Sequence, residues 1–244
     1  MINGKKNYFS IIWKSILFLS MGYVLFAGLS FPIVKSPSNW NEFPLIPGLE
    51  DKARIIFYHV PTAWLSVIAF LSAMIYGIKY LKTEEIDNDL KSLASLQLGM
   101  LFCVLATLTG SIWAKFSWGS FWNWDPRETS IFVLLIIYGA LFALRSSIEN
   151  ENKRAKLSAV YAIISFLTVP FFIFIMPRIM AGLHPGSIDD TSSGPIVDFK
   201  MNGNMLVIFF ISLGAFTILY FWLWNLGVRL LLVKDKLLKN NSEF

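Results

Sequence analysis

The sequence predicts an all-α integral membrane protein with six transmembrane helices and both termini in the cytoplasm. Of its 244 residues, 55% are hydrophobic and only 15% are charged, which is too apolar a balance for a soluble domain. Six apolar runs approach the length of about 20 residues with which a helix crosses a bilayer. Lysine and arginine are also shared unequally between the two sides that six such helices define.

These runs take up nearly the whole chain, so we expect a single six-helix membrane domain over residues 1–244. The first run follows three lysines, but its length and the lack of an Ala-x-Ala-like exit favour a retained helix over a signal peptide. The fourth run is short, and the sixth is long enough to tilt. In order, the runs are Ile16–Val34, Ile55–Tyr80, Leu93–Ile112, Thr129–Leu144, Leu157–Met176 and Met205–Val233.

The basic residues give the orientation of these helices. Fourteen of the 21 lie on the side of the termini and seven on the other side, so the positive-inside rule places the termini in the cytoplasm. The outer face then carries three loops, at about residues 35–54, 113–128 and 178–203. The net charge of +5 belongs to this membrane topology, and we expect no nucleic-acid partner.

The first outer loop leads into a histidine at the membrane boundary. Arg54 precedes His59 and Pro61, and proline is best tolerated in the first turn of a helix. We therefore expect His59 at or just before the start of the second helix. An interfacial histidine that only caps the helix or donates a hydrogen bond is the ordinary alternative.

The second outer loop is unusually aromatic. Four of the nine tryptophans fall among twelve residues, and the six aromatic positions are Trp113, Phe116, Trp118, Phe121, Trp122 and Trp124. If this stretch is helical, Trp118, Phe121 and Trp122 share one face. Tryptophan also gathers at bilayer interfaces without binding anything. The density favours a flat shelf for a large planar ligand with anionic groups, a description that haem fits.

A charged edge follows the aromatic residues. Asp125 and Pro126, with Glu128 three residues after the aspartate, have the pattern of a helix N-cap, a proline at the first helical position and a capping box. Arg127 is costly to leave unpaired at a membrane boundary. We expect it to pair with Asp125, with Glu128 or with an anionic group of a ligand.

The third outer loop presents the second histidine. Pro170 should kink the fifth helix and Pro177 should end it, after which residues 178–186 form a short apolar turn bearing His184. A metal site of His184 with Asp189 and Asp190 is a weaker alternative. On the cytoplasmic side, Glu84, Glu85, Asp87 and Asp89 look like solvated connectors.

Cys103 is the only cysteine, so the chain has no CxxCH site for covalent haem. The sequence resembles the haem-handling "WWD" proteins of cytochrome c maturation through Trp118-Gly-x-x-Trp122-x-Trp124-Asp125-x-Arg127-x-Thr129. His59-Val-Pro61-x-Ala63-Trp64 and Leu183-His184-x-Gly186 resemble the two histidine sites of the CcmC type. Phe121 stands where that type often has tryptophan, and Asp-Pro-Arg-Glu-Thr is closer to the larger CcsA type, whose extra helices and histidines this chain lacks.

This resemblance implies a transfer platform, not an enzyme, at the outer face of the bacterial inner membrane. It would hold haem b non-covalently, with His59 and His184 as axial ligands of the iron. It would deliver haem to a periplasmic chaperone of the CcmE type, beside a small subunit of the CcmD type and an ABC transporter of the CcmA/CcmB type. The implied haem-contacting residues are Trp118, Gly119, Phe121, Trp122, Trp124 and Asp125, with Arg54, Arg127 and Arg178 near the propionates.

Two other functions fit a six-helix membrane protein. A b-type cytochrome usually places its histidines deep within helices, whereas both histidines here are expected at one face. A transporter needs polar residues deep in its helices, and the apolar runs contain almost none.

Overall fold

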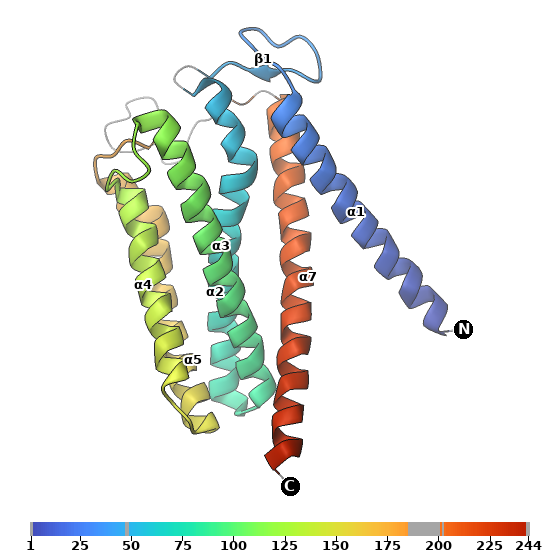
Figure 1. Cartoon of the computed structure of the whole chain (residues 1–244), viewed down its shortest axis with the longest axis vertical. Helices are drawn as coiled ribbons and strands as arrows, with labels where there is room; N and C mark the ends of the chain where they lie inside the picture. The colour runs from blue at the N-terminus through green and yellow to red at the C-terminus, as the bar shows by residue number, and fades with distance from the viewer. Residues whose placement is uncertain (1, 47–48, 185–200, 202, 243–244) are drawn as a thin grey trace. The chain divides into compact units, whose positions relative to one another are not determined.

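The computed structural model describes residues 2–46, 49–184, 201 and 203–242. It is almost entirely helical (Figure 1), and six of its helices are long and apolar enough to cross a membrane. This confirms the predicted class of six-span membrane protein. The elements are α1 (Ile2–Ser30), β1 (Ile33–Val34), β2 (Phe43–Pro44), η1 (Glu50–Ile55), α2 (Ile56–Thr83), α3 (Ile86–Trp118), α4 (Pro126–Ser146), α5 (Glu151–Pro170), η2 (Phe171–Ile175), α6 (Met176–Ile179) and α7 (Gly203–Ser242).

The chain divides into two compact units. The first consists of residues 1–61 and 199–221, and the second of residues 62–198 and 222–244. Two of the boundaries, after residues 61 and 221, fall within α2 and α7, so each of these helices contributes to both units. We describe the two units separately.

The first unit corrects one predicted boundary. The opening helix ends at Ser30, four residues before the predicted end at Val34, because Pro32 disfavours helical geometry at the residue before it. Ile33–Val34 instead pairs in parallel with Phe43–Pro44. The apolar run therefore continued past the helix into a short strand, and hydropathy alone does not distinguish the two.

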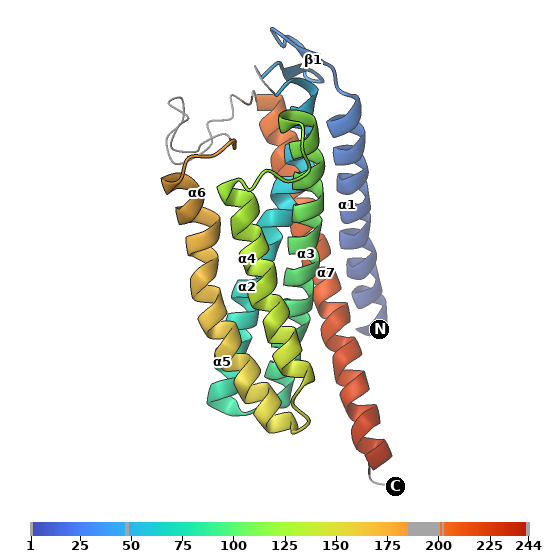
Figure 2. The ribbon, with the colours of Figure 1, turned by 60° about the vertical axis from the view of Figure 1, so that its left-hand side comes forward.

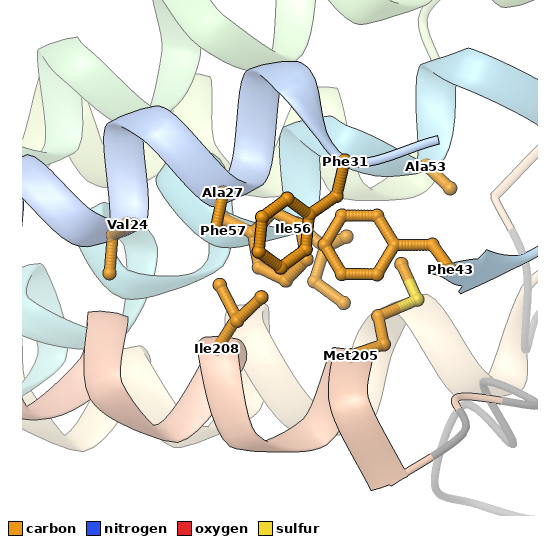
Figure 3. Close-up of a cluster of buried hydrophobic side chains, with 9 residues drawn as sticks. All are labelled: Val24, Ala27, Phe31, Phe43, Ala53, Ile56, Phe57, Met205 and Ile208. Atoms are coloured by element: carbon orange, nitrogen blue, oxygen red, sulfur yellow. The ribbon is translucent and has the colours of Figure 1, made fainter. Parts of the chain in front are cut away.

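Apolar side chains from α1, the loop and both shared helices form the core of the first unit. Figure 3 shows this cluster, in which Phe31 and Phe43 lie among side chains of α2 and α7. The ring centroids of Phe31 and Phe43 are 5.6 Å apart, and those of Phe43 and Phe57 are 5.4 Å apart. This aromatic contact fixes the entry to α2 just before His59.

Pro61 lies one turn further into its helix than the sequence predicts, because α2 begins at Ile56 and follows directly from η1. His59 is accordingly the fourth residue of α2. A proline within a helix has no N–H to donate to the carbonyl four residues earlier, which here belongs to Phe57. The hydroxyl of Ser212, buried on α7, donates to that carbonyl oxygen. A second helix thus supplies the hydrogen bond that Pro61 cannot make.

We expect Ser212→Ala to lower the free energy of unfolding by about 1–3 kcal/mol, the cost of leaving a buried acceptor unsatisfied. Denaturation of the detergent-solubilised protein, followed by tryptophan fluorescence, measures this. In a Pro61→Ala background the restored N–H should reduce the loss. Ser66→Ala is the control, since Ser66 is equally buried but donates to Ala63 in its own helix. An equal loss with and without Pro61 would contradict this account.

The second unit packs α3, α4 and α5 with the longer part of α2. Helices α4 and α5 lie side by side (Figures 1 and 2), and α3 also contacts α4. At the centre, the rings of Phe70 and Tyr138 are stacked with centroids 3.5 Å apart. Both rings are buried, as is Cys103. These contacts join α2, α3 and α4. The aromatic segment connects the end of α3 to the start of α4.

Pro170 interrupts the regular α-helix as the sequence suggests, whereas Pro177 acts differently from prediction. Pro170 is the last residue of α5, and the chain continues as the π-helical turn η2. Pro177 does not end the span: it lies in the short helix α6, which follows η2 directly. The helical path therefore continues to Ile179.

At the other end of α3 and α4, Asp89 departs from the predicted solvated connector. Helix α3 begins at Ile86, so Asp89 lies on a helix, where it is buried. Its carboxylate forms a bidentate pair with the guanidinium of Arg145 near the end of α4. Glu84, Glu85 and Asp87 are exposed as expected.

Candidate functional site

The aromatic segment begins where α3 ends. Gly119 caps the helix with φ of 85° and donates its N–H to the carbonyl of Lys115 at 3.1 Å. Glycine takes up this left-handed conformation without a steric penalty. Phe121 and Trp122 therefore lie beyond the helix, and the shared helical face considered for them with Trp118 does not exist.

A carboxylate holds the end of this segment. Trp124 has φ of 57°, a conformation that costs about 1–3 kcal/mol in residues other than glycine. The turn points the N–H groups of Asn123 and Asp125 at Oε2 of Glu128, at 2.7 and 3.3 Å. Glu128 is itself buried. The strained turn is thus fixed by the first turn of α4.

The predicted capping box is confirmed. Asp125 is the N-cap of α4, Pro126 is its first residue, and the side chains of Asp125 and Glu128 each accept from the backbone of the other end of the box. Oδ1 of Asp125 lies 2.9 Å from the backbone nitrogen of Arg127. The backbone N–H groups of the capping box are therefore satisfied by side chains of the same segment.

Asp125 also binds the loop that carries His184. Its Oδ2 accepts from the backbone N–H groups of Leu183 and His184, at 2.7 and 3.3 Å. Its Oδ1 lies 3.2 Å from Nδ1 of the His184 ring. One buried carboxylate thus joins the start of α4 to a histidine 59 residues away.

Its surroundings keep this carboxylate ionised. Burial alone would raise the pKa of Asp125, but the hydrogen bond and the charge of His184, with the N–H groups of Arg127 and Leu183, lower it to about 2. An ionised carboxylate only accepts hydrogen bonds, so Nδ1 of His184 must be the donor. The lone pair of neutral His184 is then on Nε2, the arrangement in which an imidazole binds a metal.

Two tryptophans pack against His184. The centroid of its ring is 4.8 Å from that of Trp118 and 5.5 Å from that of Trp113. The His184 side chain remains 22% exposed, so the contact leaves the ring partly accessible. Trp113 was one of the six aromatic positions noted in the sequence, but it was not among the predicted site residues. Spacing gave no signal for it, because a residue five positions before Trp118 does not share its helical face.

The other aromatic residues form a second group. Trp122 and Trp124 pack edge to face against Phe132 of α4, with centroids 6.0 and 6.4 Å away. Trp124 and Phe121 are largely exposed. The predicted single shelf therefore consists of one pair of rings at His184 and a second pair over α4.

Two guanidinium groups belong to the same unit. Nε of Arg127 is buried and has no hydrogen-bond partner among the described residues. Arg178 is close enough for its positive charge to repel that of Arg127. The guanidinium of Arg178 also donates to the carbonyl of Phe174 at 2.8 Å. A pair of guanidinium groups, one with a buried Nε that has no partner among the described residues, is suited to an anionic group.

His59 and Arg54 lie in the first unit. The His59 side chain is partly buried on α2. Arg54 donates to the carbonyls of Gly28 and Phe31, at 3.0 and 2.8 Å, and forms a 3.3 Å ion pair with Asp51. Its guanidinium thus caps the end of α1, a role that the sequence did not reveal.

In the alternative metal site of His184 with Asp189 and Asp190, both aspartates lie outside the described residues. Gly186 of the histidine motif also lies outside them. Within the described ranges, no three histidine, cysteine or acidic side chains are grouped closely enough to hold a metal ion.

The fold and these residues define a class: a six-span membrane protein in which a capping aspartate holds a histidine against two rings of a tryptophan-rich segment. The chain belongs to the Heme exporter protein C (CcmC) family, whose model matches residues 6–242. The family match and the six apolar helices together identify a multi-pass membrane protein.

Individual relatives agree with this assignment. The heme exporter protein C of Haemophilus influenzae is 30% identical over 212 residues, 87% of this chain and 81% of the relative. That of Bradyrhizobium diazoefficiens is 33% identical over 121 residues, 50% of this chain and 46% of the relative. The cytochrome c biogenesis protein CcsA of Cuscuta reflexa is 34% identical over 120 residues, 48% of this chain and 38% of the relative. For several relatives, including that of Bradyrhizobium diazoefficiens, the chain spans only about half of the relative's length.

Proposed function

We propose that this protein binds haem at the Trp118–His184 site and passes it on during cytochrome c maturation. Membership of the Heme exporter protein C family supports haem as the cargo. The observation that carries the proposal is the contact of His184 with Asp125, Trp113 and Trp118. It provides an iron-binding nitrogen next to aromatic surface, the two features that a planar metalloporphyrin needs.

The iron is held by imidazole, with His184 as one axial ligand and His59 as the other, as the family resemblance implies. Imidazole is a usual ligand of haem iron, and the identity of the axial ligands sets the redox level. The haem rings gain about 25 cal/mol for each Å² of apolar surface removed from water, which favours the exposed aromatic segment. Residues Gly119, Phe121, Trp122 and Trp124 belong to that surface.

The propionates pair with arginine. Arg127 is the stronger candidate, because its buried Nε has no partner among the described residues, and Arg178 supplies a second charge. Arg54 already donates to three groups of its own unit, so a propionate would have to compete for its guanidinium. The haem is haem b, bound without a covalent link, since the lone Cys103 is buried in α3.

The site belongs to a transfer platform, not to an enzyme. We place it on the periplasmic side of the bacterial inner membrane, with the termini in the cytoplasm, in keeping with the distribution of basic residues. The acceptor is a haem chaperone of the CcmE type. A small membrane subunit of the CcmD type and an ABC transporter of the CcmA/CcmB type complete the proposed assembly.

Absorption spectra of the detergent-purified protein, oxidised and reduced, test this function. We expect a low-spin bis-histidine haem spectrum that His184→Ala or His59→Ala disrupts. The matched control is Gly139→Ala, since a methyl group at Gly139 would meet no atom within 4 Å. Unchanged spectra in both histidine variants would show that haem is bound elsewhere, and a protein without haem from a haem-replete host would refute the proposal.

A further inference from the structure

We infer that Asp125 is a positioning residue for haem: it holds His184 in the tautomer whose Nε2 faces the ligand. This rests on the proposed function only in naming haem as the ligand. The positioning itself is a property of the chain without haem. Asp125 does not have to touch the haem, although the sequence placed it among the haem-contacting residues.

The hydrogen bonds assign the donor. The Asp125 carboxylate accepts hydrogen bonds from the backbone N–H groups of Arg127, Leu183 and His184. It is the acceptor in each of these bonds, and its Oδ1 also lies 3.2 Å from Nδ1 of the His184 ring. A neutral imidazole has one N–H, so Nε2 keeps its lone pair. Carboxylates that accept from a metal-binding histidine fix its tautomer and ring orientation in the same way.

The same carboxylate fixes the backbone of the loop. Two of its bonds go to main-chain N–H groups, so the ring and the chain that carries it are held together. The approach is close: a Cβ added to Gly182 would lie 2.7 Å from Oδ2 of Asp125 and 3.0 Å from Cδ of Pro126. A residue larger than glycine at position 182 would separate the loop from the carboxylate.

The rings of Trp113 and Trp118 limit the remaining freedom of the imidazole. With Nδ1 bound and two rings against it, His184 reaches its ligand orientation before haem arrives. Preorganisation of this kind lowers the ordering cost of binding. The negative partner also makes the imidazole more basic, which stabilises oxidised iron relative to reduced iron.

Nitrogen NMR of the haem-free protein tests the tautomer directly. The chain has only two histidines, so ¹⁵N-histidine labelling gives two sets of ring signals, and His184→Ala assigns them. At alkaline pH we expect a protonated Nδ1 and an unprotonated Nε2 for His184. Asp125→Asn should weaken the preference for the Nδ1–H tautomer, because the amide is uncharged and has one acceptor oxygen where the carboxylate has two. That one oxygen cannot serve both the ring and cap side, where Oδ1 lies, and the loop N–H groups, where Oδ2 lies.

Gly182→Ala provides a second, independent variant. It leaves Asp125 and His184 unchanged but moves the loop, so the same loss of the Nδ1–H tautomer is expected. Gly139→Ala should leave the His184 signals as in the wild type. An Nε2–H tautomer in the wild type, or an unchanged tautomer in both Asp125→Asn and Gly182→Ala, would overturn the inference.

The haem-loaded protein gives a second readout. We expect Asp125→Asn to shift the midpoint potential of the bound haem to a more positive value, with the low-spin spectrum retained. An unshifted potential would show that the carboxylate does not act on the iron through His184. If the wild type binds no haem but shows the Nδ1–H tautomer, the proposed function fails and the positioning by Asp125 stands. If the wild type binds haem through His184 but shows the Nε2–H tautomer without haem, the proposed function stands and the positioning by Asp125 fails.

Discussion

Replacing Asp89 by alanine is expected to lower the free energy of unfolding by about 3–5 kcal/mol, the usual loss when one partner of a buried ion pair is removed. Arg145 would keep its charge in a buried position without a counter-ion. The two side chains are only 5% and 9% exposed, and the pair is bidentate. Arg145→Met should cost a similar amount, because it leaves the Asp89 carboxylate unpaired. Denaturation in detergent measures both.

The double variant Asp89→Leu with Arg145→Met distinguishes a lost attraction from an unpaired charge. Two apolar side chains leave no charge in the interior, so we expect the double variant to recover most of the loss of either single variant. Asp87→Ala is the matched control, since Asp87 lies on the same turn of α3 but is exposed, and its loss should be within about 0.5 kcal/mol of zero. Additive losses in the double variant would contradict the account.

Local sequence patterns predicted the parts of this structure that depend on neighbouring residues. The six spans follow from runs of apolar residues, because a helix in a bilayer needs little besides length and apolarity. The capping box at Asp125 follows from Asp-Pro-x-Glu, because all its hydrogen bonds join residues at most three apart. The break in the fifth span, although assigned to a simple kink, was also signalled locally by Pro170.

The parts that escaped prediction depend on residues far apart in the chain. Asp125 and His184 were both selected, yet nothing in either motif shows that the aspartate binds the histidine 59 residues later. Asp89 reads as one of several acidic residues in a connector until Arg145, 56 positions away, is placed beside it. Tertiary hydrogen bonds decided both cases, and hydropathy does not report them. The left-handed turn at Trp124 was missed for another reason: Glu128, which holds the turn, is only four residues away, but tryptophan itself does not favour this conformation.

Gly99→Ala is expected to destabilise the second unit by about 1–3 kcal/mol through overpacking. A Cβ at this position would lie 2.5 Å from Cε1 and 2.6 Å from Cδ1 of Phe70. The phenyl ring cannot give way easily, because its other face is stacked on Tyr138 with centroids 3.5 Å apart. In an open helical position the same substitution would instead gain about 0.5–1 kcal/mol from helix propensity.

Gly139→Ala supplies that open position, and Phe70→Leu supplies a rescue. A methyl group at Gly139 on α4 meets nothing within 4 Å, so this variant should be at least as stable as the wild type. Phe70→Leu alone leaves a cavity, but combined with Gly99→Ala it makes room for the methyl group, so the double variant should lose less than the sum of the two single losses. Denaturation in detergent gives all four values. If Gly99→Ala proves as harmless as Gly139→Ala, then Phe70 of α2 does not press against α3 at Gly99, and its stack on Tyr138 of α4 is looser than this geometry requires.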